Sequence, residues 1–290
     1  MSNLVELAIN AANLGSLYAL MALGLVLIYG ILRLVNFAYG ELVMVVGYAL
    51  YLMRGSPLPW LVMALVAVLA AVFASVLTER IAFRPVRDKS LTAMLVTSFA
   101  VSTLLQTAAQ LFISPRSRVV PTPDLFTTTV EISGNLVPVR ELIAIATSVV
   151  MLVLFTLILN RTVLGIALRA AAENFRMTRM LGVPANLVIS TAFAISGFLA
   201  GVVALFWLGR AGSVTPGIGL QPLIVAFVAT VLGGMHTLVG AVVGGYALGI
   251  MTVVINTFVP EGLTDYREAF IFALVILILI VRPEGLVRSK

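Results

Sequence analysis

The stretch LAINAANLGSLYALMALGLVLIYG, residues 7–30, contains no aspartate, glutamate, lysine or arginine. A helix needs about 20 apolar residues to cross a hydrocarbon core that is about 30 Å thick. The composition of the whole chain agrees, because 61% of its 290 residues are hydrophobic and only 10% are charged. A soluble domain has about 25% charged residues. The sequence therefore predicts an all-α integral membrane protein.

Apolar runs bounded by charges and prolines recur along the whole chain. They predict spans near residues 7–30, 34–53, 58–77, 91–113, 141–160, 187–209, 222–238, 240–259 and 267–281. We expect a polytopic bundle of about 8–9 transmembrane helices that forms a single domain over residues 1–290. The glycine-rich stretch 222–259 is compatible with two short spans or with a re-entrant pair. The first run has no basic lead and continues into a full span, so we expect no cleavable signal peptide.

Basic residues predict the orientation of these spans. If the cytoplasmic segments are those around Arg33, 78–90, 161–186 and 282–290, that side holds twelve of the eighteen Lys and Arg residues. Because short cytoplasmic loops are enriched in Lys and Arg, we expect the N-terminus outside and the C-terminus in the cytoplasm. The connection 114–140 is then the sizeable external loop. Alternating residues on either side of Ser133 and Gly134 predict a hairpin in it.

Several classes of function are excluded by residue counts. The chain has no cysteine and a single histidine, His236, so it offers neither thiol chemistry nor a metal site. A Ser/His/Asp set is therefore not expected, and no phosphate-binding G-x-x-x-x-G-K-[ST] motif occurs. We expect neither an enzyme nor a bound cofactor. The formal charge of +6 fits membrane orientation better than nucleic-acid binding.

The segment 161–186 interrupts the apolar pattern. Apolar residues recur in it at spacings of four, three and four, at Leu164, Leu168, Ala171 and Phe175. Charged residues share another face, at Arg169, Glu173 and Arg176. This pattern predicts an amphipathic helix, which Gly182 and Pro184 end. It is either a loop that arginines hold at the lipid headgroups or a docking element, because the small side chains of residues 170–172 permit close approach of a partner protein.

Five stretches together carry a resemblance to a known family. They are GSLYALMALGLVLIYGILRLVNFAYGELVMVVGY at 15–48, RPVRDKSLTAMLVTSFAVSTLLQ at 84–106, LRAAAENFRMTRMLGV at 168–183, VLGG at 231–234 with the glycines after it, and REAFIFALVILILIVRPEGL at 267–286. Nearly end to end, they resemble the H-type permeases, which are membrane subunits of ATP-binding-cassette (ABC) importers for branched-chain amino acids. Tyr39 is a departure, because that family commonly shows His at this place. The spacing from Ala172 to Gly182 also differs from the EAA loop of the sugar-type importers.

The resemblance implies a function and a set of partners. The chain would form half of the pathway for branched-chain amino acids or a related solute such as urea, an amide or a small carboxylate. Its partners would be a second permease subunit in a heterodimer, two ABC ATPase subunits that use ATP, and an external solute-binding protein. Its location would be a bacterial cytoplasmic (inner) membrane. The residues implied to couple to the ATPase are Arg169, Ala170, Ala171, Ala172, Glu173, Arg176, Leu181 and Gly182.

Glu41 is a carboxylate inside an apolar span, where a charge costs about 2.5–3.5 kcal/mol on insertion scales. It therefore faces protein or water, either as an interhelical contact or as part of the translocation pathway. We assign the pathway to Asn36, Tyr39, Gly40, Glu41, Gln106, Gly233 and Gly234. A carboxylate without a basic partner in the spans is a poor proton relay. This weakens the alternative of a stand-alone facilitator or ion-coupled carrier, and a glycine-rich interior argues against a non-transporting scaffold.

Overall fold

The computed structural model describes residues 4–87, 89–132, 135–235 and 237–287 and is mostly helical. Its α-helices are α1 (Leu4–Leu32), α2 (Glu41–Met53), α3 (Trp60–Thr78), α4 (Leu91–Phe112), α5 (Val139–Arg161), α6 (Val163–Met180), α7 (Ala185–Ala211), α8 (Leu220–Gly233), α9 (Leu238–Phe258) and α10 (Arg267–Val281). Its strands are β1 (Arg118–Val119), β2 (Thr129–Ile132), β3 (Asn135–Pro138) and β4 (Ser213–Val214). A π-helical turn covers Glu79–Phe83, and 3-10 turns cover Phe37–Tyr39, Asp124–Phe126 and Glu261–Tyr266.

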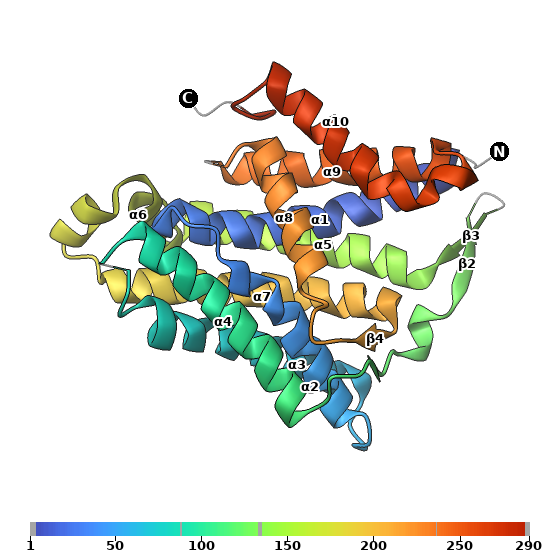
Figure 1. Cartoon of the computed structure of the whole chain (residues 1–290), viewed down its shortest axis with the longest axis horizontal. Helices are drawn as coiled ribbons and strands as arrows, with labels where there is room; N and C mark the ends of the chain where they lie inside the picture. Colours follow the sequence, from blue (N-terminus) through green and yellow to red (C-terminus); the bar gives the residue numbers. More distant parts are fainter. Residues whose placement is uncertain (1–3, 88, 133–134, 236, 288–290) are drawn as a thin grey trace. The chain divides into compact units, whose positions relative to one another are not determined.

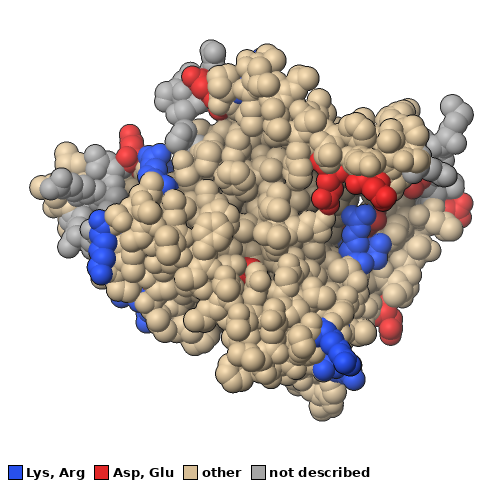
Figure 2. All heavy atoms as spheres, in the orientation of Figure 1, with Lys and Arg blue, Asp and Glu red and all other residues tan. Residues whose placement is uncertain are grey.

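Each predicted span overlaps a helix, but the spans predicted at 34–53 and 222–238 are too long, because α2 begins only at Glu41 and α8 ends at Gly233. Six helices within the described ranges are long and apolar enough to cross a membrane: α1, α3, α4, α5, α7 and α9. The apolar helix α8 has 14 residues, a rise of about 21 Å, and is too short to cross a core of about 30 Å alone. The chain is therefore a polytopic membrane protein. On the face shown in Figure 2, charged side chains are sparse among uncharged ones.

The described chain divides into two compact units, each built from separate stretches. Unit 1 contains Met1–Val26, Asp124–Met151 and Val225–Lys290, and unit 2 contains Leu27–Pro123 and Leu152–Ile224. The hairpin predicted in the loop 114–140 is confirmed in unit 1, where β2 pairs with β3 in antiparallel register from Thr129 opposite Pro138 to Ile132 opposite Asn135. Its expected turn residues, Ser133 and Gly134, lie outside the described residues.

In unit 1, α9 carries glycines on two faces, and α10 packs beside it (Figure 1). A Cβ on Gly244 would lie 2.0 Å from the carbonyl oxygen of Ala229 in α8. A Cβ on Gly249 would lie 2.4 Å from Cα of Gly15 in α1, and one on Gly245 would lie 2.3 Å from the backbone nitrogen of Ala19. Small residues let membrane helices approach this closely. The glycine series therefore belongs to helix packing, with α8 and α9 joined by a short turn.

In unit 2, α3 packs against both α7 and α2, and α2 also packs against α7 (Figure 1). The connections that follow α4 and α7 meet at one end of these helices. There β1 pairs with β4 in antiparallel register, with Arg118 opposite Val214. The indole nitrogen of Trp60 donates a hydrogen bond to the carbonyl of Pro121, at 3.1 Å. These contacts bring the connections that follow α4 and α7 to the start of α3.

Candidate functional site

Glu41 stands at the first position of α2, directly after a break in the helical backbone. The 3-10 turn Phe37–Tyr39 precedes it, and the side-chain oxygen of Asn36 caps that turn by accepting a hydrogen bond from the backbone nitrogen of Ala38, at 3.0 Å. Asn36, Tyr39 and Glu41 are all buried. The break therefore gathers polar groups inside an otherwise apolar segment.

Helix α4 supplies the hydrogen-bond donors to this carboxylate. Ser102 donates to Glu41 Oε1 at 2.9 Å, and the side-chain nitrogen of Gln106 donates to the same oxygen at 2.7 Å. The hydroxyl of Ser98 accepts from the backbone nitrogen of Phe37 at 2.7 Å. The other carboxylate oxygen, Oε2, is buried and has no hydrogen-bond partner among the residues that the structure describes. Since buried polar atoms are normally paired, this oxygen retains unused capacity to bind a donor.

A close backbone contact holds the start of α2 in place. A Cβ on Gly40 would lie 2.2 Å from the carbonyl oxygen of Gly219 and 2.8 Å from Cβ of Leu223. Any larger residue at Gly40 would push α2 away from the start of α8. Both glycines therefore position Glu41, although the sequence analysis singled out only Gly40.

The structure brings together five of the residues assigned to the pathway: Asn36, Tyr39, Gly40, Glu41 and Gln106. The role of Ser98 and Ser102 had a signal in the sequence, because the spacing 98, 102 and 106 places three polar residues on one face of a helix. Gly233 and Gly234 belong to unit 1, where they contact α9 and the C-terminal segment. Their contacts there are explained by close backbone packing, and their pathway role stays a prediction.

Helix α6 covers most of the predicted coupling segment. Five of the proposed coupling residues are exposed: Arg169, Ala170, Glu173, Leu181 and Gly182. Ala171 lies on the predicted apolar face and is only 2% exposed, so its side chain is not available for the close approach of a partner expected of residues 170–172. Ala172 is half-buried, and its carbonyl accepts a hydrogen bond from Arg33 at 3.1 Å. Part of the alanine series therefore serves packing within the chain. The side chain of Arg176 lies outside the described residues.

The predicted end of the amphipathic helix is confirmed. Helix α6 ends at Met180, Gly182 adopts a left-handed backbone with φ of 85°, and α7 begins directly after Pro184. Of the predicted apolar face, Leu168 is buried whereas Leu164 is 47% exposed. A short connection thus joins the exposed face of α6 to a long apolar helix.

Comparisons with known proteins cover nearly the whole chain. A family model described as branched-chain amino acid transport system / permease component matches residues 7–279. The high-affinity branched-chain amino acid transport system permease protein BraD of Pseudomonas aeruginosa is 35% identical, over 96% of this chain and 94% of that protein. The corresponding LivH of Escherichia coli strain K12 is 34% identical, over 96% and 93%. A probable LivH of Methanocaldococcus jannaschii is 27% identical, over 93% and 88%.

Proposed function

The chain belongs to the family of permease components of branched-chain amino acid transport systems, and from this premise we propose that it forms half of the membrane pathway of an ABC importer. The resemblance seen in the sequence is confirmed, and the family is one of transport permeases rather than enzymes. The observation that carries the proposal is the end-to-end match at 35% identity to a protein named as such a permease.

We propose branched-chain amino acids as the solute, because the names of these relatives specify them. The assembly would contain a second permease, two ATPase subunits that bind ATP, and an external solute-binding protein, in a bacterial-type inner membrane. In this chain, residues 1–290 would act as one permease domain. Glu41, Ser102 and Gln106 would face the solute path, supported by the unpaired Oε2 of a buried carboxylate.

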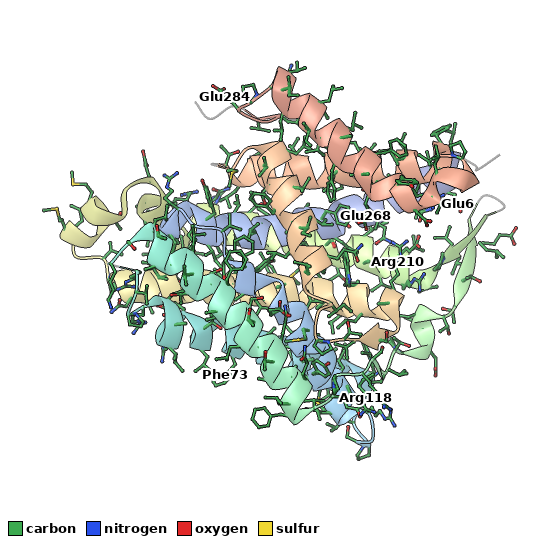
Figure 3. All side chains as sticks on the ribbon, viewed as in Figure 1. Glu6, Phe73, Arg118, Arg210, Glu268 and Glu284 are labelled. Atoms are coloured by element: carbon green, nitrogen blue, oxygen red, sulfur yellow. The ribbon has the colours of Figure 1, made fainter. Side chains whose placement is uncertain are left out.

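The proposed topology has the N-terminus outside, the C-terminus in the cytoplasm and eight or nine spans. It is supported by contacts within unit 2 between segments that we assign to the same side of the membrane. On the cytoplasmic side, Arg33 bonds to the backbone of Ala172, and Arg87 bonds to the side chain of Asn186. On the external side, Arg118, labelled in Figure 3, lies over the ring of Tyr51 at 5.5 Å from its centroid.

In unit 1, the C-terminal segment and the α8–α9 turn are also neighbours. The backbone nitrogens of Leu286 and Val287 donate to the carbonyls of Leu232 and Gly233, at 2.9 and 3.1 Å. The C-terminal ends of α8 and α10 therefore lie on the same side of the proposed membrane. Because α9 connects the end of α8 to the start of α10, this supports a crossing of the membrane by α9. In the stretch 222–259 it favours a full crossing by α9, which is long enough to span the membrane, whereas α8 is too short to cross alone.

Reconstitution in liposomes tests the proposal. The complete assembly should take up radiolabelled leucine only with ATP and the binding protein, and this chain alone should take up none. Leucine uptake by this chain alone, insensitive to ATP, would overturn the importer proposal and establish the facilitator. Urea and acetamide as competitors test whether the solute is an amino acid.

A further inference from the structure

A fully buried carboxylate lies where α3 ends. Arg84 donates to both oxygens of Glu79, from Nε to Oε1 at 3.2 Å and from Nη2 to Oε2 at 3.3 Å. The hydroxyl of Ser190 in α7 donates to Glu79 Oε2 at 2.7 Å and accepts from Arg84 Nη2 at 3.1 Å. Glu79, Arg84 and Ser190 therefore form a closed triad, which we call the α3–α7 clamp. It joins the end of α3 to α7 through the Ser190 hydroxyl, which bonds to a buried carboxylate and to a guanidinium that is 34% exposed.

The π-helical turn Glu79–Phe83 places the clamp. Its extra residue per turn is seen in the hydrogen bond from the backbone nitrogen of Arg84 to the carbonyl of Glu79, at 2.8 Å. Such turns are rare and are frequent at functional sites. The same turn directs Phe83 against Phe193 of α7, with ring centroids 5.6 Å apart. Two side chains of one turn thus contact α7.

The contacts to α7 follow one face of that helix, at Asn186, Ser190, Phe193, Gly197 and Gly201. Successive spacings of four, three, four and four residues are those of a single helical face. Arg87 bonds to Asn186, and Ser75 donates to the carbonyl of Phe193 at 2.7 Å. A Cβ on Gly197 would lie 2.7 Å from Cβ of Ser75. Residues 186–201 of α7 therefore contact α3 and residues 79–87 along one face of the helix.

The exposed face of α6 connects directly to this fastened helix. Only residues 181–184 separate α6 from α7, and α6 also packs against α7. A force applied to the exposed residues of α6 would thus reach α7 first. The clamp would then transmit the movement of α7 to α3.

We propose that Glu79, Arg84 and Ser190 are positioning residues, which make α3 move together with α7 when an ATPase subunit moves α6. This inference rests on the proposed function. The physical reason is that sliding α3 along α7 would pull the Ser190 hydroxyl away from Glu79 and Arg84, and a hydrogen bond to a buried carboxylate is costly to lose. The two hydrogen bonds of Ser190 therefore resist shear between α3 and α7, which apolar contacts alone would permit.

Ser190→Ala tests the clamp without leaving a buried charge unpaired, because Arg84 still holds Glu79. The control is Ser75→Ala, which removes another buried hydroxyl between α3 and α7 but leaves the clamp intact. In the complete reconstituted assembly, Ser190→Ala should lower leucine uptake per ATP hydrolysed by about tenfold, roughly the worth of one hydrogen bond to a charged group. Co-purification of the ATPase should remain unchanged. Ser75→Ala should keep wild-type uptake per ATP.

Equal uptake per ATP in Ser190→Ala and wild type would overturn the proposal, as would equal loss in both alanine variants. Ser190→Thr retains the hydroxyl and should restore coupling. If Ser190→Ala fails to assemble, Arg84→Lys serves instead, because it keeps the charge but loses the two-point contact. Unchanged coupling in Arg84→Lys then overturns the proposal. Uptake by the wild-type assembly that does not depend on ATP would instead contradict the proposed function.

Discussion

At the scale of residues, Glu41 has the chemistry that bears most directly on a solute. Glu41→Gln keeps the size of the side chain and an oxygen that can accept from Ser102 and Gln106, but it removes the negative charge. If Oε2 meets the solute, leucine uptake by the assembled transporter should fall by about tenfold or more, since bonds to charged groups contribute about 1.5–3 kcal/mol. Assembly should be unaffected, as measured by co-purification of the subunits.

The matched control is Glu131→Gln, which removes a carboxylate that is exposed on β2. It should leave uptake unchanged. Wild-type uptake in Glu41→Gln would reject the pathway role, and a loss of assembly would identify Glu41 as an interhelical contact instead.

At the scale of elements, we expect the exposed face of α6 to bind the ATPase subunit. Because Ala171 is buried, bulk at this position would disturb the fold itself, whereas Ala170 is exposed. Ala170→Trp should weaken ATPase binding by about fivefold or more, the effect of overpacking that costs about 1–3 kcal/mol. Val163→Trp, at an exposed position at the start of α6, is the control and should bind normally. Co-purification measures both, with membrane insertion assayed separately. Full ATPase binding by Ala170→Trp would place the docking surface elsewhere.

The contact between α3 and α7 makes a second prediction at this scale. Gly197→Val should lower the free energy of unfolding in detergent by about 1–3 kcal/mol, because its side chain would collide with Ser75 and the backbone of α3. Gly217→Val is the control, since nothing lies within 4 Å of a Cβ at that exposed position. Thermal unfolding checks the pair. Equal stability of the two variants would show that α7 adapts to bulk.

At the scale of the whole molecule, the proposed topology is open to chemical labelling, because the chain lacks cysteine. Ser117→Cys and Leu181→Cys place single thiols at exposed positions of the two opposite sides proposed. In intact cells, an impermeant maleimide should label the first, and it should label the second only after the membrane is opened. Labelling of both in intact cells would reject the orientation.

Patterns along the chain predict much of this architecture, but not the contacts between its parts. Helix positions follow from apolar runs, and Gly182 with Pro184 predicts where α6 ends. The bounds of α10 were predicted correctly, but the lengths of α2 and α8 were harder to predict, because uncharged residues continue beyond the helix ends. The pairing of Glu79 with Ser190 links positions 111 residues apart, and no local pattern specifies it. Likewise, periodicity places Leu164 and Ala171 on one face of α6, but only Ala171 is buried, because burial also depends on the elements packed around the helix.

The glycine contact between α1 and α9 has a consequence for biogenesis. Gly15 leaves the ribosome long before Gly249, against which it packs. At translation rates of about 5–20 residues per second, the delay is roughly 10–50 seconds. During that interval, α1 has been inserted but α9 has not. The face of α1 that contains Gly15 is then exposed to lipid or to the insertion machinery. Quality-control proteases therefore have their longest opportunity at the earliest helix, and a nascent chain that stalls before α9 leaves α1 orphaned in the bilayer.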